Sequence, residues 1–128
     1  MKVYYAHCQA IYHTPQEQRD INLLQQLGLI VLNPSEDTYS RKVKEIKEGH
    51  PDCGRSERVM RYFYDLVDEC DVLAFRALPD GRIPAGVVGE IEQARKGNKA
   101  IIELPSGMLS RAMSVEQTRE YLAEVGQR

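Results

Sequence analysis

The feature that most constrains the fold of this chain is the alternation of short apolar runs with longer amphipathic ones. The apolar runs at residues 2–6, 29–32, 71–75 and 99–104 have the length and composition of β-strands. Amphipathic segments with helical spacing separate them, and this β-α-β order favours parallel strands joined by right-handed crossovers. We therefore predict an α/β fold with a doubly wound parallel sheet of four to five strands, a flavodoxin- or Rossmann-like three-layer sandwich.

Local signals mark the ends of the helices between these strands. Thr14 is a suitable N-cap, Pro15 fits the first turn, and Glu17 completes a T-x-x-E capping box. Gly28 is placed to end this helix in a left-handed conformation. Similar signals predict helices at 56–69, 85–96 and 114–125, and leave 35–48 as either a solvated helix or a mobile flap.

Length and charge narrow the classes of function. The chain has 128 residues and a formal net charge of -2, which fits one domain spanning 1–128 and argues against a nucleic-acid or membrane-surface binder. No apolar run is long enough to span a membrane, and residues 1–8 do not resemble a signal peptide. The three cysteines are scattered and predict no disulfide framework. We expect a cytoplasmic protein.

Doubly wound sheets bind ligands beyond the carboxyl ends of their strands. This rule makes His7 and Asn33 candidate substrate contacts, because both directly follow a predicted strand. Arg76 and Arg82 lie after the third strand and could hold a phosphate, although solvated surface arginines are the alternative. The segments selected in this way are 7–13, 33–35, 76–86 and 105–113.

Glu90 is the most informative single residue. With Val87 on the buried face of the helix, a rotation of about 100° per residue places Glu90 on the sheet-facing half and Glu92 toward solvent. Its early position in the helix favours the ionised carboxylate, which can act as a nucleophile at a sugar carbon. The alternative is an edge glutamate that pairs with Arg82 or Arg95.

Two neighbours of this glutamate in the predicted fold are also candidates. Gly86, at the start of the same helix, would let a ligand approach the helix N-terminus closely, although such glycines often only cap or pack. Tyr4 and Tyr5 alternate across the first strand, so one of them could hold the nucleophile by a hydrogen bond, while a packed core aromatic is the alternative. His50 and Cys53 form only half a metal site, so we expect no metal.

These features together resemble the nucleoside 2-deoxyribosyltransferase family and its relatives that hydrolyse nucleoside 5′-monophosphates. The resemblance rests on a first strand with Tyr4, on the strand D-V-L-A-F at 71–75, and on G-V-V-G-E at 86–90 followed by G-N-K-A-I-I at 97–102. It spans nearly the whole chain, although its motifs are short. It implies that Glu90 forms a covalent glycosyl-enzyme and that Tyr4 supports it.

The resemblance also implies further site residues and an assembly. The sugar-binding aspartate of the family is represented nearest by Asp65, half a turn away from the matching register, which Phe63 occupies. Pro84 and Ala85 stand where several nucleotide hydrolases have a serine before the glycine. The segment 105–113 looks like one that a neighbouring subunit lends to the active site, which points to Ser110 or Arg111 and to a homodimer.

The sequence therefore predicts an enzyme that cleaves or transfers at the N-glycosidic bond of a nucleoside or nucleoside 5′-monophosphate, without a metal or organic cofactor. Two alternatives stay open. One is a non-catalytic nucleotide sensor with the same fold. The other is a hydrolase of a nicotinamide or ADP-ribose nucleotide, which needs the same sugar chemistry with a different base.

Overall fold

The computed structural model describes residues 1–49, 55–106 and 111–127. Its centre is a parallel four-stranded sheet in the order β2-β1-β3-β4. β2 and β1 lie on one side of the boundary between β1 and β3, and β3 and β4 lie on the other. From β1 the chain adds strands in one direction across the sheet, and from β3 it adds them in the opposite direction. The strands are β1 (Lys2–Ala6), β2 (Ile30–Leu32), β3 (Val72–Phe75) and β4 (Ala100–Glu103).

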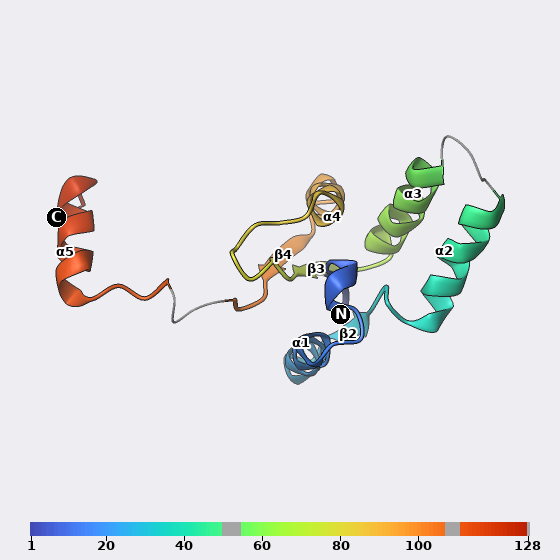
Figure 1. Cartoon of the computed structure of the whole chain (residues 1–128), viewed down its shortest axis with the longest axis horizontal. Coiled ribbons are helices and arrows are strands. Elements are labelled where there is room, and N and C mark those ends of the chain that lie inside the picture. Colours follow the sequence, from blue (N-terminus) through green and yellow to red (C-terminus); the bar gives the residue numbers. More distant parts are fainter. Residues whose placement is uncertain (50–54, 107–110, 128) are drawn as a thin grey trace.

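Helices cover the two faces of the sheet and produce the three-layer sandwich (Figure 1). On one face, α4 packs on β3 and β4, α3 packs against α4, and α2 packs against α3. On the other face, α1 packs beside β2. The prediction of a doubly wound α/β fold is confirmed. The helices are α1 (Pro15–Gln26), α2 (Asp37–Gly49), α3 (Arg55–Asp68), α4 (Ala85–Lys96) and α5 (Val115–Glu124), with a short 3-10 helix η1 (Gln9–Ile11).

The two faces of β1 build two separate hydrophobic cores, because successive side chains of a strand point to opposite faces. Tyr4 belongs to the core under α3 and α4, and Tyr5 belongs to the core under α1. Both tyrosines are fully buried, and the four residues of β3 are buried as well. A central strand pair buried on both faces is what a doubly wound sheet requires.

The helix ends follow the predicted signals with one difference. The Thr14 hydroxyl accepts a hydrogen bond from the Glu17 N–H, and Gly28 adopts a positive φ of 82°. The Glu17 side chain, however, does not close a capping box on Thr14. It accepts from the backbone N–H of His13 instead. Residues 37–49 form a helix, which decides between the two interpretations of that segment.

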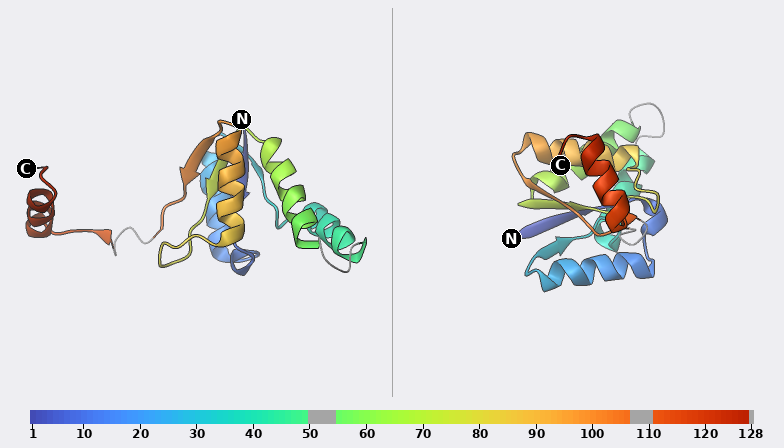
Figure 2. Two further views of the ribbon diagram at one scale, coloured as in Figure 1. Left: turned by 90° about the horizontal axis from the view of Figure 1, so that it is seen from above. Right: turned by 90° about the vertical axis from the view of Figure 1, so that its left-hand side faces the viewer.

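α5 stands apart from the sandwich in Figure 1 and in the left view of Figure 2. Its N-terminus has the full capping box, in which Ser114 and Gln117 each bond the other's backbone N–H. None of its described residues is buried. Large apolar side chains of this tail are therefore exposed to solvent, namely Met113, Val115, Tyr121 and Val125. Among the described parts of the chain, no helix is long and apolar enough to cross a membrane.

Candidate functional site

Glu90 is the buried carboxylate of α4 that faces the sheet. It is only 7% exposed, whereas Glu92, two residues on, points to solvent. The placement of both side chains agrees with the predicted helix rotation. The Tyr4 hydroxyl, from the centre of β1, donates a hydrogen bond to Glu90 Oε2. This contact joins the first strand to the fourth helix across 86 positions of sequence.

The protonation of Glu90 differs from the sequence-based expectation. Burial raises its pKa to about 7, although the hydrogen bond from Tyr4 acts in the opposite direction. Among the residues that the structure describes, Glu90 takes part in no ion pair, so no cation offsets the loss of water. Its early position in α4 therefore does not keep the carboxyl as acidic as we expected. Burial outweighs the hydrogen bond from Tyr4.

A cavity of about 270 Å³ opens over Glu90 at the carboxyl ends of β1 and β3. Its walls come from three segments: the η1 region after β1, the middle of α3, and the start of α4. Gly86 is one of the lining residues, and a Cβ built there would project into open space, with no atom within 4 Å outside its own helix and chain neighbours. The residues that line the cavity are His7, Cys8, Gln9, Tyr12, Met60, Phe63, Pro84, Gly86, Val87 and Glu90.

The chemistry of these walls is mostly apolar and aromatic. Tyr12 follows η1 directly and lines the site, and burial together with the Glu90 charge raises the pKa of its hydroxyl, so Tyr12 is neutral at physiological pH. Phe63 and Met60 contribute apolar surface from α3. A cavity with apolar walls and one polar focus is a common arrangement for a planar organic ligand. Here that focus is the Glu90 carboxyl.

His7 lines the cavity but is not free to bind a ligand through its ring nitrogens. Its Nε2 lies 2.7 Å from Glu17 Oε2, and its Nδ1 lies 3.0 Å from the carbonyl oxygen of Tyr5. The ring also stacks on Tyr5, with 3.7 Å between ring centroids. Both of its polar atoms therefore already have partners within the protein.

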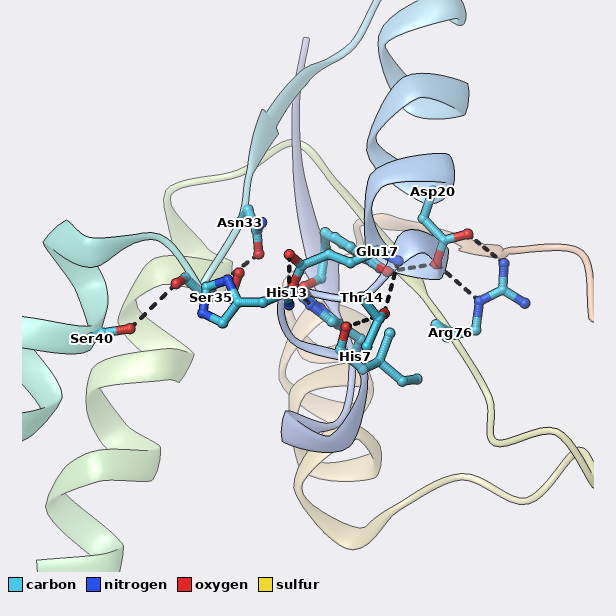
Figure 3. A network of polar contacts seen from close by, with 11 residues as sticks. His7, His13, Thr14, Glu17, Asp20, Asn33, Ser35, Ser40 and Arg76 are labelled. Atoms are coloured by element: carbon cyan, nitrogen blue, oxygen red, sulfur yellow. Dashed lines mark hydrogen bonds and ion pairs between the residues drawn. The ribbon is translucent and has the colours of Figure 1, made fainter.

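Arg76 lies on the opposite side of the sheet from Glu90. It is 6% exposed, and its Nε and Nη2 donate to the two carboxylate oxygens of Asp20 at 3.0 and 2.5 Å (Figure 3). Its Nη1 donates to the carbonyl oxygen of Pro105 at 2.5 Å. Tyr5 completes the group by donating to Asp20 at 2.5 Å. The guanidinium is therefore engaged in an internal ion pair, and the sequence did not indicate this partner.

The other predicted contacts are spread over the molecule. Arg82 is exposed and pairs with Asp80 in its own loop. Asp65 is exposed and lines a separate groove of about 660 Å³ between α3 and α4. The Asn33 side chain is buried, and its oxygen accepts from the Ser35 N–H. None of these three is among the residues that line the Glu90 cavity.

The remaining predictions concern the tail and metals. Arg111 is exposed at the start of the last described segment, and Ser110 lies outside the described residues. His50 and Cys53, the half metal site of the sequence, also lie outside them. Within the described parts of the chain, no group of three histidine, cysteine or acidic side chains is arranged to hold a metal ion.

Sequence reasoning missed two buried acids of α1, Glu17 and Asp20. Glu17 lies four positions before Ile21, and Asp20 lies four positions before Leu24. Residues four apart share a helix face. That spacing could have shown that these carboxylates face the sheet rather than solvent. Neither the protein-family models nor the curated proteins that were searched match this chain.

Proposed function

We propose that the protein cleaves or transfers at the N-glycosidic bond of a nucleoside or nucleoside 5′-monophosphate. The observation that carries this proposal is a buried carboxyl, Glu90, at the floor of a cavity with apolar and aromatic walls, held by the Tyr4 hydroxyl. The resemblance around Tyr4 and Glu90 supports the same chemistry. A cytoplasmic location suits this reaction.

The reaction follows from the position of Glu90. In its ionised form, the carboxylate attacks the anomeric carbon from the face opposite the base. The carbon–nitrogen bond breaks, its electron pair leaves with the base, and the base takes up a proton. Water or a second base then attacks the same carbon, breaks its bond to Glu90 and gives up a proton to solvent, which balances the proton taken up by the leaving base. Tyr4 fixes the carboxylate orientation and opposes the rise in its pKa.

The test is a panel of nucleosides and 5′-monophosphates, with free base measured by chromatography. Glu90→Ala is expected to abolish base release, a loss of about a thousandfold or more, because Glu90 is the only carboxyl among the described residues that line the cavity. Glu92→Ala is the matched control, since it removes an exposed carboxylate from the same helix and should leave turnover unchanged. Near-wild-type turnover of Glu90→Ala would refute the proposal.

The same panel separates the alternatives. Binding of nucleotides without any released base would favour the non-catalytic sensor. Release of nicotinamide alone would favour the hydrolase of nicotinamide or ADP-ribose nucleotides. For the proposed reaction, kcat/KM rises with pH and reaches a plateau above about 7, because the nucleophile must be ionised and its pKa is about 7.

We also propose that a 5′-phosphate contributes to substrate recognition through Arg82 and not through Arg76. Arg82 is exposed in the loop before α4, where its ion pair with Asp80 is open to solvent, whereas Arg76 is buried in its ion pair with Asp20. A monophosphate should therefore have a kcat/KM about tenfold or more above that of its nucleoside, and Arg82→Ala should remove most of that difference. A ratio near one would mean that Arg82 is only a solvated surface residue.

The active unit is proposed to be a homodimer in which the tail of each copy packs on the other. α5 and its C-cap carry apolar side chains at Val115, Leu122 and Val125, which share a helix face, and yet α5 stands apart from its own sandwich. A second copy is the partner that would cover this face. Light scattering should report a dimer at micromolar concentration, and Leu122→Glu should shift it toward monomer. A stable, active wild-type monomer would rule the dimer out.

A further inference from the structure

Glu17 is a buried carboxylate that the proposed reaction does not use. It lies in the first turn of α1 and is 6% exposed. One oxygen, Oε2, lies 2.7 Å from His7 Nε2, and the other, Oε1, accepts from the backbone N–H of His13 at 3.1 Å (Figure 3). Burial raises the pKa of Glu17, but the bonds from His7, Ser35 and His13 outweigh it and hold the pKa below its usual value.

Two of these partners belong to one short segment, residues 7–13, which connects β1 to α1. His7 begins the segment, and its ring is fixed on its other side by the carbonyl oxygen of Tyr5. His13 ends the segment with a φ of 61°, a left-handed conformation that residues other than glycine rarely adopt. Glu17 therefore holds both ends of the segment with its two oxygens.

The segment that Glu17 holds is also a wall of the Glu90 cavity. His7, Cys8, Gln9 and Tyr12 all line it. The Tyr12 ring packs at a tilt on the His7 ring, with 4.8 Å between the ring centroids. A shift of His7 would therefore also move the Tyr12 side chain that lines the cavity. Glu17 itself is not among the cavity residues. Its influence on a ligand is therefore indirect.

We propose that Glu17 is a positioning residue of the Glu90 site. It fixes the 7–13 segment through His7 and His13 and so sets the wall against which the planar base of the substrate packs. This inference rests on the proposed function for the identity of the ligand. Because the wall contacts the base in the ground state and in the transition state alike, loosening it should weaken substrate binding more than chemistry.

The experiment compares four variants by steady-state base release. Glu17→Ala is expected to raise KM about tenfold or more while kcat stays within about threefold of wild type. Glu17→Gln should keep KM within about threefold, because its amide oxygen can accept from the His13 N–H and its amide nitrogen can donate to a neutral His7 ring. Glu17→Asp is too short to reach both partners and should behave like Glu17→Ala.

Asp37→Ala is the matched control. Asp37 is an exposed carboxylate in the first turn of α2, so its removal changes the charge at a helix N-terminus without touching residues 7–13. It should leave KM and kcat unchanged. If Glu17→Ala does not fold, Glu17→Asp is compared with wild type and Asp37→Ala in its place. A wild-type KM in these variants, or a loss confined to kcat, would overturn the proposal.

Hydrogen exchange separates this inference from the proposed function. If the wild-type protein released no base from any substrate, the proposed function would fail, but the role of Glu17 could still be judged. Amide exchange in residues 8–13 should then be about tenfold faster in Glu17→Ala than in wild type, with Glu17→Gln and Asp37→Ala close to wild type. Unchanged exchange in Glu17→Ala would overturn the inference by itself.

Discussion

Two adjacent tyrosines of β1 meet two very different carboxyl groups. Tyr4 points to the α4 face and donates to Glu90, and Tyr5 points to the α1 face and donates to Asp20. Both carboxyls are buried. Asp20 also receives the forked guanidinium of Arg76, whereas Glu90 takes part in no ion pair among the described residues.

The contrast appears in the acidity of the two groups. Burial raises the pKa of Asp20, but hydrogen bonds from Arg76, Tyr5 and Gln16 outweigh it and leave the pKa below its usual value. For Glu90, burial dominates and raises the pKa to about 7. A buried carboxylate that is paired depends on its cation, because removing one partner leaves an uncompensated charge, and an unpaired one beside a cavity is available for chemistry. The same strand thus supports a structural site on one face and a candidate reactive site on the other.

The largest effect on stability is expected from breaking the Asp20 pair. Arg76→Met should lower the free energy of unfolding by about 3–5 kcal/mol, because it leaves a buried carboxylate without its cation. Urea unfolding at pH 7 measures this. Because the pKa of Asp20 is depressed, the loss should be present at neutral pH and should fade as pH falls through the acid range.

Two variants sharpen this test. Asp20→Leu combined with Arg76→Met should recover much of the loss, since it removes both charges together. Arg82→Met breaks an ion pair at the surface and should change stability little. Equal stabilities for wild type and Arg76→Met would contradict the structural role assigned to the α1 face.

The pH dependence of stability that comes from Glu90 is expected to have the opposite sign to that from Asp20. Its raised pKa means that wild-type stability falls as pH rises from about 4.5 to about 7, because the folded state resists ionising this carboxyl. Glu90→Gln cannot ionise and can still accept from Tyr4. Relative to wild type, it should therefore gain about 2 to 3 kcal/mol between pH 5 and pH 8. A pH-independent difference would show that Glu90 titrates near its ordinary pKa.

The smallest effects are expected from removing the hydroxyl groups of Tyr4 and Tyr5. One substitution should mainly change activity, and the other should mainly change stability. Tyr4→Phe removes the bond that lowers the Glu90 pKa, so kcat/KM should fall about tenfold at pH 7 and its pH midpoint should move upward. Tyr5→Phe should leave that midpoint in place and cost about 1–2 kcal/mol of stability. If both variants shifted the midpoint equally, the two faces would not be independent.

Much of the fold could be predicted from the sequence because its signals are local. Thr14, Gly28 and Ser114 mark helix ends through bonds and backbone conformations that involve only nearby residues. The inward position of Glu90 followed from helix geometry alone. The β1 alternation also predicted that Tyr4 and Tyr5 serve different faces, although it could not assign a carboxyl to each.

The pairing of charges could not be predicted, because it depends on residues that are distant in sequence. Asp20 and Arg76 are 56 positions apart, and nothing local to either residue indicates the other. Arg76 therefore looked like a free cation at the ligand end of the sheet. Glu17 similarly looked like half of a capping box, while its oxygens bond His7 and the backbone of His13.

The sequence by itself determined the order of strands and helices, the parallel sheet, and the direction in which each helix face points. These follow from hydrophobic spacing and steric limits on the backbone, which act over a few residues. Only the tertiary structure decided which buried carboxyl has a cation and which does not. That depends on the burial and the partners that each carboxyl acquires when distant segments come together. This difference makes Glu90 the candidate reactive group and gives Asp20 a structural role.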